Sequence, residues 1–221
     1  MTPDVDLAIL GGGCAGLSLA RRLAEAGDRA PRTLVLDARE TYEDDRTWCF
    51  WRVEETPFDA RIAAAWERVR VRSQGGEAVS GCAGHPYVML PARPVYQDCL
   101  SAIEAAPRLR LALGAPVGAG SERADGTFAI ETPAGLVTAA RVVDTRPARA
   151  PHRGDAVLWQ SFLGREIECD ADVFDATLAE LMDFEPARPD RIGFVYVLPL
   201  ERGRALVEVT VLAETPLPPA A

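Results

Sequence analysis

Three glycines near the start of the chain have the spacing of a dinucleotide-binding loop. Gly11, Gly13 and Gly16 fit the pattern G-x-G-x-x-G, and Cys14 and Ala15 lie between the last two. The first glycine of this pattern permits a tight turn, the second lets a pyrophosphate approach the backbone, and the third allows close packing of helix on strand. N–H groups at the start of the helix can then bind phosphate. We expect these five residues to contact a nucleotide cofactor.

The segments around this loop have the order of a nucleotide-binding βαβ unit. Asp4–Leu10 is a short apolar run typical of a buried strand, and apolar residues recur at helical spacing between Ala15 and Gly27. Thr33–Asp37 predicts a second buried strand. Asp37 follows the loop by about 20 positions, where such proteins place the carboxylate that accepts hydrogen bonds from ribose hydroxyls. The spacing suits NAD or FAD, although an N-terminal unit of this kind is more typical of FAD enzymes; the alternative is a glycine-rich turn in an unrelated α/β protein.

Aromatic residues gather in the stretch DDRTWCFW, Asp44–Trp51, which holds two of the chain's four tryptophans. The aromatics do not alternate as in a strand, and the run is too short for an amphipathic helix face. Trp48, Phe50 and Trp51 could line a site or pack into a core between two subdomains. Arg46 could pair with a neighbouring aspartate or with a cofactor phosphate.

One acidic residue near the C-terminus lies in an apolar strand pattern. Glu208 is the charged residue of ALVEVTVL. Burial would disfavour its carboxylate and raise its pKa, as a general acid requires near neutral pH. The alternative is a glutamate on the solvated face of a half-buried strand.

Composition excludes several classes of protein. The chain has 221 residues and a formal net charge of -9, which argues against a nucleic-acid-binding surface. No apolar run approaches the roughly 18 residues of a membrane span, and the opening residues lack the basic region of a secretory signal. We therefore expect a cytoplasmic protein. Five cysteines without a C-x-x-C pair and only two histidines predict neither a disulfide framework nor a metal site.

After residue 40 the pattern is less regular. Ala60–Arg70 is compatible with a helix or with an extended segment, and residues 74–84 contain glycine and serine and predict a loop. Pro94–Ala106 predicts a helix. We expect further strands at Leu109–Leu113, in a hairpin of Thr127–Thr132 with Gly135–Val143, in a buried strand ending at Asp144, and at Leu158–Phe162, Ile192–Pro199 and Ala205–Leu212.

These elements predict an α/β protein. The last strands alternate more, which favours an antiparallel sheet. We expect a Rossmann-like FAD-binding βαβ domain with an interleaved, mostly antiparallel β substrate subdomain. The boundaries would be residues 1–150 for the FAD/NAD(P)-binding domain and 151–221 for the start of the substrate-binding subdomain.

Several segments, in order, resemble bacterial lycopene β-cyclases, which are flavoproteins of carotenoid biosynthesis. They are DLAILGGGCAGLSLA, DRTWCFW, VVDTRP, WQSFLGREIE, FDATLAELMDF and FVYVLPL. The glycine loop is shared by many flavoproteins, whereas DRTWCFW and Gln160–Phe184 are more specific. The resemblance runs from about residue 4 to residue 212 and adds Asp144, in VVDTRP, to the expected cofactor-binding residues.

The resemblance implies a redox-neutral reaction on lycopene or a related linear carotenoid. An acid protonates the terminal double bond, a neighbouring double bond attacks the tertiary cation, and loss of a proton gives a β-ring. Glu208 matches the family's catalytic acid, while Val209 replaces a second acidic residue. Trp48, Phe50 and Trp51 would line the substrate pocket. The resemblance also implies FAD in reduced form, NAD(P)H as the electron source, and peripheral contact with the membrane that holds so apolar a substrate.

Cyclases of this family are considerably longer, and the resemblance stops just after Glu208. The ending TPLPPAA predicts an unstructured tail, and we expect a truncated chain that binds FAD poorly by itself. Two alternatives stay open: another FAD-dependent oxidoreductase, such as a monooxygenase or an isoprenoid reductase, and a non-catalytic fragment.

Overall fold

The computed structural model describes residues 2–118, 120–147, 158–184 and 192–215. The chain divides into two compact units, and each is built from two separate segments. Unit 1 comprises Met1–Arg46 with Ala92–Arg149, and unit 2 comprises Thr47–Pro91 with Ala150–Ala221. The chain therefore crosses between units at Arg46 and returns at Ala92, within the range that the sequence analysis assigned to one domain. The reason is strand pairing, because residues 47–91 supply strands to both sheets of unit 2.

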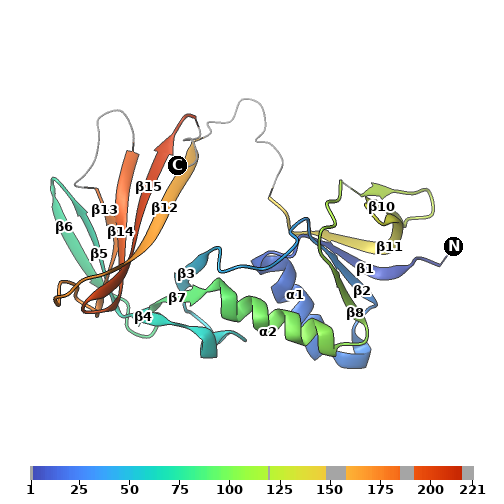
Figure 1. The fold of residues 1–221 in the computed structure, drawn as a ribbon, viewed down its shortest axis with the longest axis horizontal. Helices are drawn as coiled ribbons and strands as arrows, with labels where there is room; N and C mark the ends of the chain where they lie inside the picture. Colours follow the sequence, from blue (N-terminus) through green and yellow to red (C-terminus); the bar gives the residue numbers. More distant parts are fainter. Residues whose placement is uncertain (1, 119, 148–157, 185–191, 216–221) are drawn as a thin grey trace. The chain divides into compact units, whose positions relative to one another are not determined.

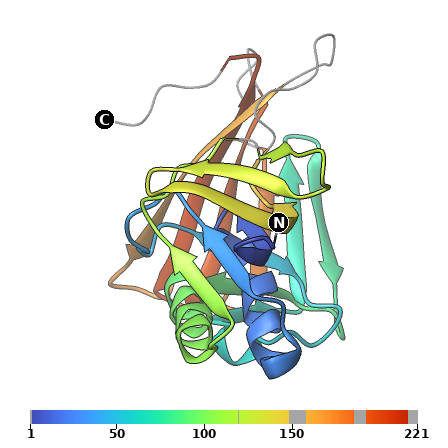
Figure 2. The same cartoon turned by 90° about the vertical axis from the view of Figure 1, so that its right-hand side faces the viewer.

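Unit 1 contains a six-stranded sheet in the order β8-β2-β1-β11-β10-β9 (Figures 1 and 2). Its first four strands are parallel, and β10 and β9 extend the sheet in antiparallel fashion. The predicted parallel βαβ unit and the predicted hairpin are therefore confirmed. The strands are β1 (Val5–Leu10), β2 (Thr33–Leu36), β8 (Leu109–Ala112), β9 (Ser121–Glu122), β10 (Phe128–Thr132) and β11 (Gly135–Asp144).

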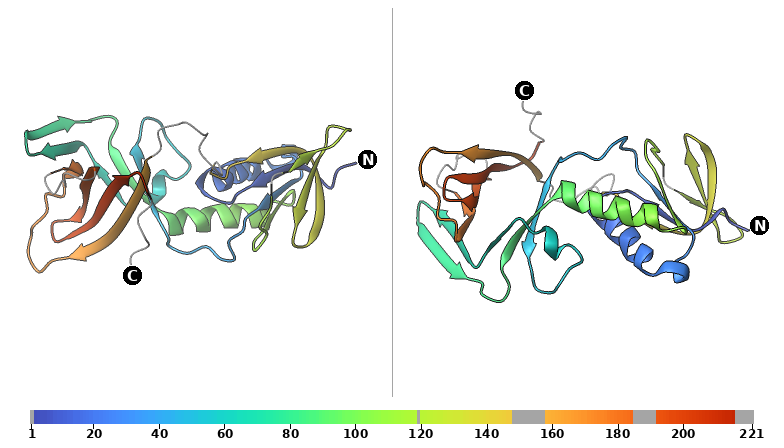
Figure 3. Two further views of the ribbon diagram at one scale, coloured as in Figure 1. Left: turned by 90° about the horizontal axis from the view of Figure 1, so that it is seen from above. Right: turned by 60° about the horizontal axis from the view of Figure 1, so that its bottom comes forward.

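Two helices accompany this sheet. α1 (Cys14–Glu25) and α2 (Ala92–Ala105) pack against each other, and both contact β8 (Figure 3). α1 buries Leu17 and Ala20, which lie three residues apart on one helix face. The helix ends before a short 3-10 turn, Gly27–Arg29, that leads into β2.

Unit 2 consists of two sheets. The larger has the order β12-β15-β14-β13-β5-β6 and is antiparallel except for the pair β13 and β5. The smaller has the antiparallel order β3-β7-β4. The strands are β3 (Thr47–Trp51), β4 (Ala64–Trp66), β5 (Arg68–Ser73), β6 (Gly76–Gly81), β7 (Tyr87–Pro91), β12 (Trp159–Glu168), β13 (Leu178–Asp183), β14 (Ile192–Glu201) and β15 (Arg204–Ala213). A second short 3-10 turn, Asp59–Arg61, precedes β4.

The core of unit 2 joins the two sheets. Trp66 and Met89 from the small sheet pack with Ala179 and Leu198 from the large one. Trp66 is 1% exposed, and its indole N–H donates a hydrogen bond of 3.0 Å to the carbonyl oxygen of Pro199. Each side chain buried this way removes apolar surface from water, which is the main favourable contribution to folding.

Three local predictions were wrong or incomplete, all in residues 47–91. The aromatic run is a strand, β3, because it pairs along its length with β7. The undecided segment Ala60–Arg70 is mainly extended, and residues 74–84 contain a strand, β6, that forms a hairpin with β5. In addition, β11 is one long strand of the hairpin and is largely exposed rather than buried. These strands are determined by long-range pairing more than by local preference.

Three further observations concern membrane-spanning helices, the cysteines and the C-terminal tail. In the part of the chain that the structure describes, no helix is long and apolar enough to cross a membrane. All five cysteines are free thiols. The predicted unstructured tail lies almost entirely outside the described residues, as does the segment around residue 150.

Candidate functional site

The glycine loop connects β1 to α1 and has the backbone geometry that requires glycine. Gly11 has a φ angle of +100°, a conformation that other residues rarely adopt. A Cβ at Gly16 would overlap with the carbonyl oxygen of Gly11, so the helix can approach the strand only with glycine there. A Cβ at Gly13 would meet no atom within 4 Å. The loop therefore leaves open space above Gly13, at the start of the helix.

This open space faces the N-terminus of α1. The N-cap residue is Gly13, which has no side chain to bind the first-turn N–H groups, and the helix begins at Cys14 followed by Ala15. Unpaired N–H groups and the helix dipole make such an end favourable for an anion. The spacing predicts a diphosphate here, and the open helix end leaves room for one; its binding stays a prediction.

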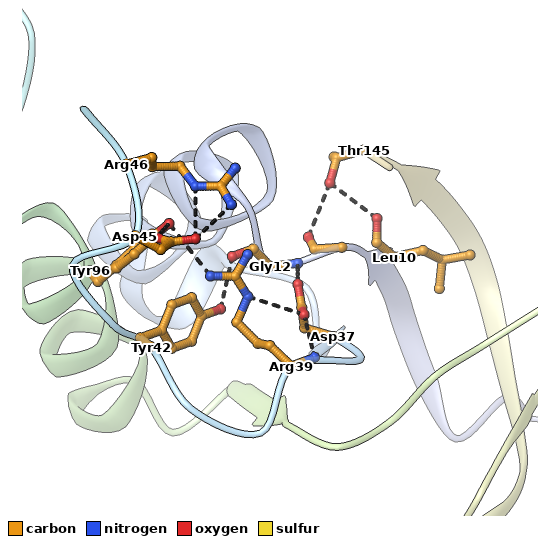
Figure 4. Close-up of polar contacts among 10 residues, drawn as sticks. Leu10, Gly12, Asp37, Arg39, Tyr42, Asp45, Arg46, Tyr96 and Thr145 are labelled. Carbon is orange, nitrogen blue, oxygen red and sulfur yellow. Dashed lines mark hydrogen bonds and ion pairs between the residues drawn. The ribbon is translucent and has the colours of Figure 1, made fainter. Parts of the chain in front are cut away.

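Asp37 follows β2 and lies against the loop. Its Oδ2 accepts a hydrogen bond from the backbone N–H of Gly12, and its Oδ1 accepts hydrogen bonds from the backbone N–H and the Nε of Arg39, at 2.8 and 3.2 Å (Figure 4). Beside Asp37 lies a pocket of about 190 Å³. Its lining includes Gly11, Leu36, Asp37, Ala115, Val117 and Arg146. A carboxylate beside such a pocket can accept hydrogen bonds from a ribose diol.

Residues after β11 hold the loop from the other side. Leu10 of β1 pairs with Asp144 of β11, so the VVDTRP segment reaches the glycines directly. The hydroxyl of Thr145 donates to the carbonyl oxygens of Leu10 and Gly11, each at 3.0 Å (Figure 4). Asp144 accepts hydrogen bonds from the guanidinium group of Arg146, at 2.8 and 2.7 Å. Arg146, rather than Asp144, lines the pocket.

Four residues of this site were missed by the sequence analysis: Arg39, Tyr42, Thr145 and Arg146. Thr145 and Arg146 directly follow Asp144 in the VVDTRP segment. This neighbouring position could have indicated that they belong to the site. Arg39 and Tyr42 carry no motif, and only the fold brings them to the loop.

Glu208 lies at the centre of β15 in unit 2. It pairs across the sheet with Gly164 of β12 and Tyr196 of β14. A Cβ at Gly164 would lie 3.5 Å from Oε2 of Glu208, so the carboxyl group lies over this glycine. The hydroxyl of Thr210, which is fully buried, donates to Oε1 of Glu208 at 3.3 Å.

Burial raises the pKa of Glu208 above the usual value of a glutamic acid, while the hydrogen bond from Thr210 opposes this shift. Among the described residues no arginine pairs with Glu208. Burial, together with the nearby Glu208 carboxylate, raises the pKa of the Cys49 thiol to about 12. Cys49 belongs to β3, so the small sheet approaches the carboxyl group.

Side chains alternate along β3, so its aromatic residues lie on different faces. Cys49 and Trp51 share the face that meets the large sheet, where the Trp51 ring lies 5.1 Å from that of Tyr87. Trp48 and Phe50 lie on the opposite face. Trp51 is 44% exposed. Of the three predicted pocket residues, Trp51 is therefore the one that shares a face of β3 with Cys49, whose thiol lies near Glu208.

The predicted residues form two groups. Gly11, Gly13, Cys14, Ala15, Gly16, Asp37 and Asp144 come together in unit 1, whereas Trp48, Phe50, Trp51 and Glu208 belong to unit 2. In unit 1, Arg46 pairs with Asp45 at 2.6 Å. That was one of the two pairings that the sequence left open.

A family model described as "Lycopene cyclase protein" matches residues 6–221. No curated protein sequence matches the chain. The family resemblance that rested on six short segments is thereby confirmed over almost the whole chain.

Solved structures share the fold at low sequence identity. The p-nitrophenol 4-monooxygenase PnpA from Pseudomonas putida DLL-E4 is 19% identical with a TM-score of 0.65, over 92% of this chain and 56% of that one. PqsL from Pseudomonas aeruginosa, described as a probable FAD-dependent monooxygenase, is 14% identical with a TM-score of 0.67, over 95% and 60%. A geranylgeranyl bacteriochlorophyll reductase-like protein from Thermoplasma acidophilum is 16% identical with a TM-score of 0.63, over 93% and 56%.

These likenesses confirm the predicted α/β class with a Rossmann-like unit and an interleaved, mostly antiparallel β unit. The chain spans somewhat more than half the length of the solved chains that it matches.

Proposed function

The chain belongs to the lycopene cyclase family, and from this premise we propose that it converts the linear end groups of lycopene, or of a related linear carotenoid, to β-rings. The carboxyl proton of Glu208 adds to the terminal double bond of the substrate and leaves a tertiary cation. The electron pair of a neighbouring double bond closes the ring, and loss of a ring proton forms the β-ring double bond. The ring proton that is released balances the proton that Glu208 adds, so the reaction is an isomerisation without net oxidation or reduction.

The observation that carries this proposal is the environment of Glu208. A carboxyl group acts as a general acid only if it is protonated at the working pH. Burial raises the pKa of Glu208, and no described basic residue offsets this shift. The hydrogen bond from Thr210 holds one carboxyl oxygen in place. Glu208 would therefore keep a proton at a higher pH than an exposed glutamate and present it in one orientation.

The side chains around Glu208 suit a cationic intermediate. Tyr196 lies directly across from it on β14 and packs edge-on against Phe194, with ring centroids 5.2 Å apart. Trp51 and Tyr87 add aromatic surface on the side of the small sheet. Aromatic faces stabilise cations, and apolar walls exclude the water that would quench them. We assign Trp51 to the pocket by this argument, and Trp48 and Phe50 to the pocket only on the family resemblance.

We propose FAD as the cofactor. The first turn of α1, with Gly13, Cys14 and Ala15, would bind its diphosphate, and Asp37 would bind its ribose hydroxyls. The pocket beside Asp37 and the open space above Gly13 are the observations that fit this group. When bound in reduced form, FAD supplies negative charge that stabilises the cation. NAD(P)H would be the source of the electrons that keep it reduced.

The chain departs from the family beside the proposed acid. Val209 stands where the family has a second acidic residue, so Glu208 would act without that neighbour.

The apolar substrate bears on where the protein works. Because lycopene is apolar and resides in membranes, we also propose a cytoplasmic protein with peripheral contact to the membrane surface.

The test is a pigment chromatogram from a lycopene-accumulating bacterial host that expresses residues 1–221. A γ- or β-carotene peak would support the proposal, and it should disappear with Glu208→Gln. Lycopene alone, from protein shown to be folded and to bind FAD, would refute cyclase activity for this chain. Stoichiometric oxidation of NAD(P)H with a substrate would instead point to an oxidoreductase of the same fold.

A further inference from the structure

Tyr42 lies in the segment after β2 and reaches back to the glycine loop. Its hydroxyl donates a hydrogen bond of 2.8 Å to the carbonyl oxygen of Gly12 (Figure 4). The backbone N–H of the same glycine donates to Oδ2 of Asp37. Both backbone polar groups of Gly12 are therefore held by side chains. A Cβ at this position would collide with the Tyr42 hydroxyl, so the space is already filled.

Arg39 closes this set of contacts into a ring. Its Nε donates to Oδ1 of Asp37 at 3.2 Å, and its guanidinium carbon lies 4.6 Å from the ring centroid of Tyr42. Starting at Gly12, the contacts run through Asp37, Arg39 and Tyr42 and return to Gly12. The side chains are mostly buried, with exposed fractions of 13% for Asp37 and 23% for Arg39. Contacts that form a closed and buried ring restrict one another, so each member is well oriented.

The ring lies beside the pocket of about 190 Å³ that Asp37 and Gly11 help to line. Burial, reinforced by the Asp37 carboxylate, raises the pKa of Tyr42, so its hydroxyl remains a hydrogen-bond donor across the neutral range. The Tyr42 hydroxyl holds the peptide plane that follows Gly12 and Asp37 holds the plane that precedes it, so the two side chains together restrict both backbone dihedral angles of Gly12.

We propose that Tyr42, with Arg39, is a positioning residue for nucleotide binding: the two side chains hold the Asp37 carboxylate and the Gly12 backbone in the orientation that a ribose diol requires. The inference rests on the proposed binding of a nucleotide cofactor. A site held in its binding geometry loses less conformational freedom when the ligand binds, and this increases affinity.

Tyr96 provides a matched control within the same cluster. Its ring also lies near Arg39, with the guanidinium carbon 5.5 Å from the centroid. Its hydroxyl, however, donates to Asp45 at 3.0 Å and not to the loop (Figure 4). Removing this hydroxyl therefore deletes a part-buried hydrogen bond without touching Gly12 or Asp37. It also removes the long hydrogen bond of 3.5 Å that Nη1 of Arg39 donates to the Tyr96 hydroxyl, while the stacking of Arg39 on Tyr42 is kept.

The experiment measures the affinity of the 221-residue chain for ADP, which carries the adenosine and diphosphate without the flavin, by isothermal titration calorimetry. Tyr42→Phe should weaken binding about fivefold, the effect of one neutral hydrogen bond. Tyr96→Phe should change affinity less than about twofold, and Arg39→Lys, which loses the planar stacking group, should weaken binding as Tyr42→Phe does.

A double-mutant cycle separates positioning from a general loss of structure. In the Asp37→Asn background, adding Tyr42→Phe should cost little further affinity, because both side chains act on the same residue, Gly12. Additive losses, or ADP affinities of Tyr42→Phe and Arg39→Lys that equal that of the unchanged chain, would overturn the inference. If the unchanged chain binds neither ADP nor FAD, the cofactor proposal fails, and the inference fails with it.

Discussion

Replacement of Glu208 by glutamine is the most direct test of the proposed acid. Glutamine has nearly the same shape and keeps an oxygen that can accept the hydrogen bond from Thr210, which is 3.3 Å long in the native chain. It cannot deliver a carboxyl proton. General acids contribute about 10²- to 10⁴-fold to a rate. Because protonation starts this reaction, we expect β-ring formation to fall by at least about 100-fold.

The same substitution has a predicted effect on stability, with a sign that follows from the pKa shift. A carboxyl group whose pKa is raised by folding binds more protons in the folded state than in the unfolded state. Stability therefore falls as pH rises from the ordinary glutamic acid pKa of 4.5 through the folded pKa of Glu208. Glu208→Gln removes this dependence, so the variant should melt at a higher temperature than the native chain at alkaline pH. Thermal melting between pH 4 and pH 9 measures both curves.

Glu166→Gln is the matched control. Glu166 lies on β12 and faces Arg204 at 3.3 Å, with a 54% exposed side chain. Its removal deletes one exposed ion pair, which is worth little, and should leave the pigment profile unchanged. The assay is the carotenoid chromatogram, normalised to the amount of folded protein. Equal β-ring product from Glu208→Gln and the native chain would refute the assignment of the acid.

Three other predictions follow from local geometry. Gly13→Ala should leave the melting temperature nearly unchanged, because the added Cβ meets no protein atom, but should weaken ADP binding in calorimetry, because the Cβ fills the space proposed for the diphosphate. Gly16→Ala should prevent normal folding, seen by circular dichroism, because the added Cβ overlaps with the backbone of Gly11. Thr210→Val removes the hydrogen bond that lowers the pKa of Glu208, so the alkaline limb of the pH–rate profile should move to higher pH; an unchanged limb would contradict this. Trp66→Ala should cost about 3–5 kcal/mol in denaturant unfolding, because the side chain is fully buried; a loss below about 1 kcal/mol would contradict the packing.

The glycines of the loop and Asp37 were predictable because their pattern is local. Glycine spacing, the apolar run before it and the acidic residue after the second strand all lie within the first 37 residues. The glycine spacing reports backbone requirements that other residues cannot meet, such as the positive φ of Gly11. The location of the first helix followed from the 3.6-residue period of its apolar residues in the same way.

The surroundings of Glu208 were less predictable for the opposite reason. Cys49 and Tyr87 are far from Glu208 in the sequence and approach it only because β3 and β7 pair in a separate small sheet of unit 2. The aromatic run did not show the alternation of apolar and polar residues that is typical of a strand. Its aromatic side chains lie on both faces of β3. Pairing with β7 decided its conformation, and the strand alternation then separated Trp51 from Trp48 and Phe50.

By itself the sequence determined the parallel βαβ unit with its glycine loop, the family and a glutamate in an apolar strand, because these depend on short spacings and on the chemistry of single residues. Only the tertiary structure decided that residues 47–91 belong with the C-terminal strands, that Arg39 and Tyr42 close a ring on Gly12, and that Glu208 faces Tyr196 and Thr210 without a basic partner among the described residues. The physical reason is that strand pairing and burial arise between segments distant in the chain, where local preferences carry no information about the partner.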